Sequence, residues 1–105
     1  MKDKIKEFVH RMNNVSFAEL TRQIPDSAGQ RIMFTQNDSL VIWEGVSHEF
    51  AEAVEQLLAE GAIVLKPCSP MVYVADRLTL GGLPVADRVR KYAEPHWLPV
   101  VLCRT

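Results

Sequence analysis

Apolar residues recur with a helical period at the start of the chain. Ile5, Phe8, Val9 and Met12 follow the i, i+3, i+4, i+7 rule, which predicts a helix over residues 2–12. Asn13 and Asn14 follow the last of these positions and end the helix. This first element is therefore predicted to bury one apolar stripe and expose its charged side.

A second helix is predicted to begin almost at once. Ser16 and Glu19 have the spacing of a capping box, in which each side chain binds the other residue's backbone amide. Phe17, Leu20 and Ile24 form the apolar face, and Pro25 forces Ile24 out of the helical region. The helix is therefore expected to end at about residue 24.

The stretch SHEFAEAVEQLLAEGAIVL, residues 47–65, predicts a third helix followed by a strand. Ser47 is the expected N-cap, Gly61 suits the left-handed position beyond the last turn, and Leu57 is expected in the core. The outward positions carry only acidic charges, namely Glu49, Glu52, Glu55 and Glu60. This exposed face therefore opposes contact with a polyanion.

Period-two and β-branched runs predict the strands. LVIW, residues 40–43, is a short strand, with turns at PDSAGQ before it and at residues 36–38. AIVL and MVYV, residues 62–65 and 71–74, flank the turn KPCSP and are predicted to pair as a β-hairpin.

The order helix, helix, short strand, helix, hairpin resembles the winged helix-turn-helix group over roughly residues 2–76. LLAEGAIVLKPCSPMVYV is similar to the junction at which the third helix of that fold passes through a glycine into the wing. The resemblance implies one α+β domain over residues 1–105, with three helices, a short strand, a C-terminal β-hairpin and an extension at 77–105. Over twenty residues separate the second and third helices, where that fold usually has a tight turn.

The extension has element signals of its own. Val85, Val89 and Tyr92 predict a short helix over 85–93, and WLPVVLC predicts a terminal strand. Pro99 restricts that strand to an edge, or lies at its end, because proline has no amide for a central ladder. The extension either packs over the domain or presents His96, Trp97 and Pro99 to another subunit. Trp43 is likewise expected either in the core or at a contact with another subunit, and the core is favoured.

Residue patterns argue against catalysis. His48 follows Ser47 directly, and neighbouring residues on a helix do not face one another, so they form no nucleophile and base. Gly81 and Gly82 lack the Lys-Ser/Thr ending of a phosphate loop. Three histidines and two cysteines show no paired ligand spacing. We therefore expect no enzyme, metal, cofactor or small-molecule substrate.

Composition sets the remaining bounds. The chain has no apolar run long enough for a bilayer, and its charged N-terminus is unlike a signal peptide, so it is expected in the cytoplasm. In that compartment Cys68 and Cys103 are expected to be thiols. The net charge is −1, but residues 1–60 hold six Lys/Arg against ten Asp/Glu, and residues 61–105 hold six against three. A polyanion is therefore expected to meet the C-terminal half first.

Two functional hypotheses follow. The first is a non-enzymatic regulatory domain that binds DNA through the wing and basic tail, with contacts from Lys66, Arg77, Arg88, Arg90 and Lys91. The alternative is a protein-interaction module on the same scaffold, which binds a protein partner or a second copy. Its contact residues are Glu49, Glu52 and Glu55 on the third helix, or His96 and Trp97 in the tail.

Overall fold

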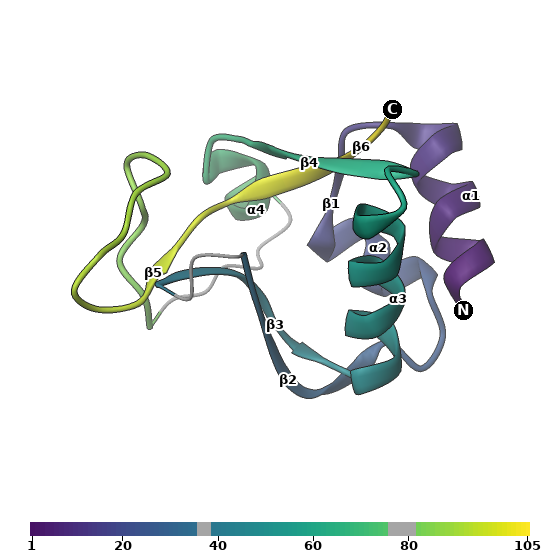
Figure 1. Ribbon diagram of the computed structural model, residues 1–105, viewed down its shortest axis with the longest axis horizontal. Coiled ribbons are helices and arrows are strands. Elements are labelled where there is room, and N and C mark those ends of the chain that lie inside the picture. The colour runs from purple at the N-terminus through teal and green to yellow at the C-terminus, as the bar shows by residue number, and fades with distance from the viewer. Residues whose placement is uncertain (36–38, 76–81) are drawn as a thin grey trace.

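The computed structural model describes residues 1–35, 39–75 and 82–105, and in this part the chain forms two three-stranded sheets and four helices (Figure 1). This is the α+β class predicted from the sequence. The helices are α1 Lys2–Met12, α2 Phe17–Gln23, α3 His48–Ala59 and α4 Met71–Ala75. The strands are β1 Val15–Ser16, β2 Ala28–Phe34, β3 Leu40–Val46, β4 Ile63–Pro67, β5 His96–Trp97 and β6 Val100–Arg104.

The three predicted helices are confirmed, and so are their caps. Asn13 and Asn14 adopt positive φ angles of 53° and 51° after α1. The Ser16 hydroxyl accepts a hydrogen bond from the Glu19 amide at 3.0 Å, completing the capping box of α2. Ser47 caps α3 in the same way, and Gly61 follows that helix at a φ of 73°. Local sequence signals therefore set where these helices begin and end.

The first sheet has the order β1-β6-β4, with both pairs antiparallel. The central strand β6 pairs Leu102 with Val15 on one side and with Leu65 on the other. Its residues 100–103 are buried, which confirms the predicted terminal strand and its packing against the domain. Pro99 lies just before β6, where its missing amide costs no ladder hydrogen bond.

The predicted hairpin of residues 62–65 with 71–74 is wrong. Residues 71–75 form helix α4, and β6 takes the place beside β4. The helix starts because Pro70 suits a first helical position and the Ser69 hydroxyl accepts from the Met71 amide at 3.2 Å. Strand β4 therefore pairs with residues more than thirty positions later in the chain.

The second sheet, β2-β3-β5, comes mainly from the long segment between α2 and α3. Strands β2 and β3 are antiparallel and β5 is parallel to β3. The residues Ala28, Gly29 and Gln30, predicted as part of a turn, belong to β2. A Cβ at Gly29 would lie 2.6 Å from the Ser47 Cα, so glycine permits this close approach. The predicted turn at residues 36–38 lies outside the described residues.

The helix predicted over residues 85–93 is also wrong. Val85 forms a parallel bridge with Trp97, and the Ala86 amide donates to the Trp97 carbonyl at 2.8 Å. Val89, expected on the buried face of that helix, is 65 % exposed. Tertiary hydrogen bonds to β5 therefore replace the helical ones, and residues 82–95 lie at the end of the molecule opposite α1 (Figure 1).

A chain of aromatic rings runs through the core and joins the second sheet to α2 and α4. Trp43 stacks on Phe17 with ring centroids 6.2 Å apart and contacts Tyr73 at 5.0 Å. Tyr73 meets Trp97 edge-on at 5.3 Å. The core position predicted for Trp43 is confirmed, as is that of Leu57, which is 1 % exposed. The two sheets therefore share one hydrophobic interior.

Candidate functional site

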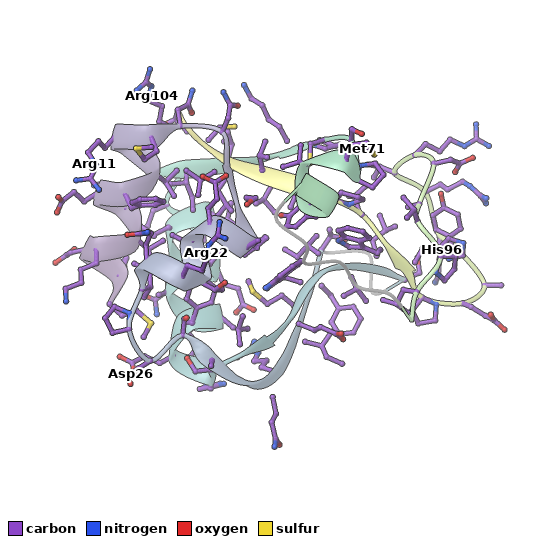
Figure 2. The ribbon with its side chains drawn as sticks, turned by 180° about the vertical axis from the view of Figure 1, so that it is seen from behind. Arg11, Arg22, Asp26, Met71, His96 and Arg104 are labelled. Atoms are coloured by element: carbon purple, nitrogen blue, oxygen red, sulfur yellow. The ribbon has the colours of Figure 1, made fainter. Side chains whose placement is uncertain are left out.

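Four of the five basic residues expected to contact DNA are exposed on β4 or in the connection between β4 and β6. Lys66 lies on β4, while Arg88, Arg90 and Lys91 lie within four consecutive positions of the loop 82–95. All four are exposed. Figure 2 shows nitrogen-tipped side chains extending from this end of the molecule, around the labelled His96. Arg77, predicted to join them, lies outside the described residues.

Tyr92 holds the loop 82–95 in a defined shape. Its hydroxyl donates to the Asp87 carboxylate at 2.6 Å and accepts from the Asp87 amide at 3.2 Å. Its own amide donates to the Ser39 hydroxyl at 2.9 Å, which ties the loop to the start of β3. The Arg90 guanidinium lies 4.0 Å from the Tyr92 ring centroid, and the His96 ring stacks at 3.9 Å. These contacts therefore preorganise the loop, which is more than a run of solvated charged residues.

An acidic group sits inside this basic loop. A hydrogen bond from Tyr92, together with the nearby charges of Arg90 and Arg88, holds the pKa of the Asp87 carboxyl below its ordinary value. Asp87 also lies 3.8 Å from the Arg90 guanidinium. Asp87 therefore stays ionised and neutralises part of the loop's positive charge.

The acidic face of α3 is partly paired with β2. Arg31 of β2 forms an ion pair with Glu55 at 2.9 Å, and its guanidinium lies 2.7 Å from Nδ1 of His48. His48 in turn lies 2.9 Å from Glu52, and Glu60 pairs with Lys2. Glu49, Glu52 and Glu55 are exposed, as the sequence predicts. The strand β2 lies beside the helix, and Arg31 offsets part of the negative charge of this face.

Of the two alternatives for the tail, the exposed Trp97 anchor is wrong, because Trp97 is 2 % exposed. Parallel pairing of β5 with β3 places it opposite Val41, inside the aromatic core. Its Nε1 has no hydrogen-bond partner among the described residues. His96 is half-buried by its stack on Tyr92. This part of the tail serves the fold and leaves only the adjoining loop for contacts.

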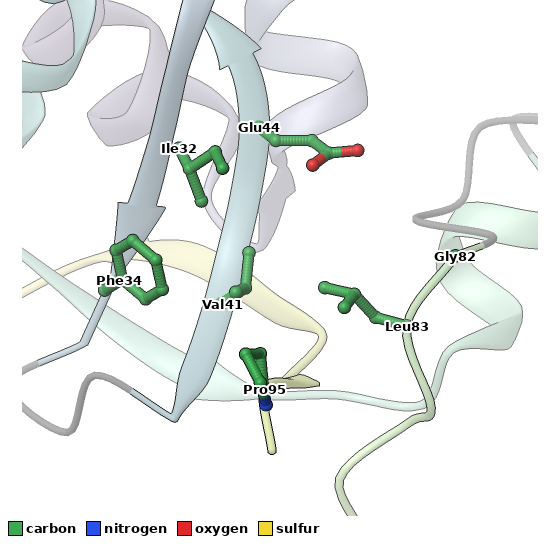
Figure 3. Close-up of a pocket in the computed structure, with 7 residues that line it drawn as sticks. All are labelled: Ile32, Phe34, Val41, Glu44, Gly82, Leu83 and Pro95. Carbon is green, nitrogen blue, oxygen red and sulfur yellow. The ribbon is translucent and has the colours of Figure 1, made fainter.

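An apolar hollow lies between the outer face of the second sheet and the loop 82–95. Its volume is about 270 Å³, and Figure 3 shows Leu83 pointing across it toward Val41. The lining residues are Ile32, Phe34, Val41, Glu44, Gly82, Leu83 and Pro95. Ile32 and Phe34 are 45 % and 44 % exposed, which is unusual for bulky apolar side chains at alternate positions of one strand. This surface could not be predicted from the sequence, because no strand was predicted over the residues that form β2.

Tyr73 is a structural residue that sequence reasoning assigned to the wrong element. Its buried hydroxyl donates to the Val100 carbonyl at 2.6 Å and accepts from the Phe17 amide at 3.0 Å. It therefore joins α4, β6 and α2 at one point. A single tyrosine in an apolar run gives no sequence signal for such a link.

Chemistry-bearing groups elsewhere are dispersed. Among residues 1–35, 39–75 and 82–105, no three His, Cys, Asp or Glu side chains gather as metal ligands. Cys68 and Cys103 are free thiols, and burial, together with the nearby Cys103 thiol, raises the pKa of Cys68.

None of the described helices combines the length and apolar character that a bilayer span requires.

No protein-family model matches this chain, and neither a curated protein nor a solved structure is significantly similar to it.

Proposed function

We propose that this chain is a winged-helix-type domain that binds DNA through the loop between β4 and β6. The order of elements supports it: β1 follows the first helix, β4 follows the third helix, and the last strand β6 lies between them. In this assignment β6, rather than residues 71–74, is the second strand of the wing. The wing is then the whole connection of residues 68–99, and β2 with β3 form an insertion before α3.

Charge supports the wing as the contact surface. Cations that neutralise phosphates supply nearly all non-specific affinity for DNA. Lys66, Arg88, Arg90 and Lys91 are exposed on or beside the wing, and Tyr92 fixes the backbone that carries three of them. A preorganised loop loses less conformational entropy on binding than a mobile one. The observation that carries the proposal is this ordered cluster of exposed cations.

The acidic helix α3 is held away from the duplex in this binding mode. Its exposed carboxylates would repel phosphates, and β2 lies beside it through the Arg31–Glu55 ion pair. A glutamate can accept a hydrogen bond from cytosine, but α3 presents no Lys or Arg to offset its repulsion. The DNA contact is therefore led by the wing.

The alternative is a protein-interaction module on the same scaffold. The observation that favours it is the apolar hollow beside Ile32 and Phe34, since surfaces of this kind mark partner sites more often than DNA contacts. Trp97 is buried, so the hollow rather than this side chain supports the alternative.

Fluorescence anisotropy with a random-sequence duplex tests the proposal. The wild-type chain should bind at about 0.05 M salt and weaken steeply by about 0.2 M. A trace that stays flat at both salt concentrations would rule out non-specific DNA binding and leave the protein-interaction alternative.

A further inference from the structure

We propose that two copies of this chain associate, with Val89 of each copy inserted in the apolar hollow of the other. The proposal goes beyond DNA binding and is tested without DNA. Both proposals use Arg88, so a second copy and a duplex would compete for that side chain. The dimer proposal rests on two unpartnered apolar surfaces and on the charges placed beside each of them.

The receiving surface is the hollow on the outer face of the second sheet. Ile32 and Phe34 on β2 lie beside Val41 on β3, with Leu83 on the opposite side (Figure 3). At about 270 Å³ it is large enough to accept one branched aliphatic side chain. Water covering these side chains is displaced on insertion, which provides the driving force.

The inserted group is the tip of the loop 82–95. Val89 is 65 % exposed although the backbone around it is held by Tyr92. A valine fixed in this exposed position loses little entropy when it is buried, because valine has only one side-chain torsion. The tip is therefore suited to insertion into a concave apolar surface.

Charge complementarity identifies the occupant as a second copy. The hollow carries one carboxylate, Glu44, which is exposed and has no ion pair with any described residue. The hollow is therefore expected to accept an apolar side chain that has a positively charged residue beside it. Val89 lies between Arg88 and Arg90, and Arg90 is already engaged with Asp87 and Tyr92. The cation that pairs with Glu44 is then Arg88.

A twofold axis satisfies both contacts at once. The hollow is lined by Leu83 and Pro95, near the two ends of the loop that carries Val89 at its tip. Donor and acceptor surfaces thus lie at the same end of the molecule, and a symmetric pair of insertions closes the assembly as a dimer. The opposite end, with α1, stays free.

Sedimentation equilibrium without DNA tests the dimer, over protein concentrations from about 1 µM to about 1 mM. The wild-type chain should approach twice its monomer mass. Val89→Asp should weaken association more than tenfold, whereas Met12→Asp, at a similarly exposed apolar position on α1, should have no effect. Circular dichroism checks that each variant is folded. A monomer at every concentration, or a Val89→Asp chain that dimerises normally, would overturn the proposal.

Charge reversal then tests the pairing itself. Glu44→Arg and Arg88→Glu should each be monomeric alone, and an equimolar mixture of the two should form a dimer, because one intermolecular pair is then that of the wild type and the other is restored with reversed sign. A mixture that stays monomeric would contradict the Glu44–Arg88 contact. Association of the wild type through a different face would appear as a dimer that is insensitive to both changes. If the hollow binds an unrelated protein instead, the wild type would form no dimer.

Discussion

The Arg31 guanidinium on β2 lies 2.9 Å from the Glu55 carboxylate on α3. This ion pair joins strand β2 to helix α3, whose exposed face carries acidic side chains. Exposed pairs of this kind contribute only about 0–1 kcal/mol to stability. The pair offsets one carboxylate on α3, but Glu49 and Glu52 remain exposed on the same helix, so this face opposes contact with a polyanion.

The first prediction concerns the packing of α3. Leu57→Ala should lower the free energy of unfolding by about 2 to 5 kcal/mol, because Leu57 is fully buried and its truncation leaves a cavity. Gln56→Ala, at the adjacent exposed position, should change it by less than about 0.5 kcal/mol. Urea denaturation measures both. Equal stability of the two variants would show that α3 is not packed as described.

The second prediction concerns the cap of α2. Ser16→Ala should destabilise the chain by about 0.5 to 2 kcal/mol, since the Glu19 amide loses its acceptor in a buried position. Glu19→Gln keeps a side-chain acceptor for the Ser16 amide and should cost less. A larger loss for Glu19→Gln in thermal melts would count against the capping box.

The third prediction concerns the Tyr73 hydroxyl. Tyr73→Phe removes the bridge between the Phe17 amide and the Val100 carbonyl, and leaves both groups buried without that partner. Such a loss should cost about 1 to 3 kcal/mol. Chemical denaturation measures the change, and a phenylalanine variant as stable as wild type would show that water replaces the hydroxyl.

The fourth prediction concerns the ionisation of Asp87. NMR titration of its carboxyl carbon should give a pKa below the ordinary value of about 3.9, and Tyr92→Phe should move it back toward that value. Because the folded-state pKa is lowered, ionised Asp87 stabilises the loop fully above about pH 3.9, and this contribution is lost as the pH falls through the lower folded value. An unchanged pKa in Tyr92→Phe would contradict the cause assigned to the shift.

Local signals in the sequence predicted the three longer helices because their caps and stops lie within a few residues of each other. Ser16 with Glu19, Ser47 and Gly61 act in the structure as expected. The partner strand of β4 could not be placed in this way. Val72 and Tyr73 have strand propensity, but Ser69 and Pro70 start a helix there, and the partner of β4 lies far along the chain.

The candidate site was predicted only in its composition. Exposure of Arg88, Arg90 and Lys91 follows from their charge. Their fixed arrangement depends on Tyr92, whose hydrogen bonds to Asp87 and Ser39 are set by tertiary contacts that no spacing reveals. The apolar hollow was missed for the same reason, since Ile32 and Leu83 meet only after β2, β3 and the loop 82–95 have assembled.

The salt dependence of DNA binding tests the central claim, that the wing cations rather than charge in general hold the duplex. The wing variant Arg88→Ala/Arg90→Ala/Lys91→Ala is compared with Lys4→Ala/Lys6→Ala/Arg11→Ala. The control removes three exposed cations from α1, at the opposite end of the molecule. Both variants change the net charge by the same amount. A difference between them therefore reports position.

The measurement is the slope of log K against log salt concentration, by fluorescence anisotropy with random-sequence duplex. The wing variant should bind far more weakly, and any residual binding should have a slope flatter by roughly one unit for each cation removed, whereas the α1 variant should keep the wild-type slope. Glu52→Gln/Glu55→Gln should bind more tightly than wild type, because repulsion from α3 is reduced. Equal losses in the wing and α1 variants would contradict a wing-led contact.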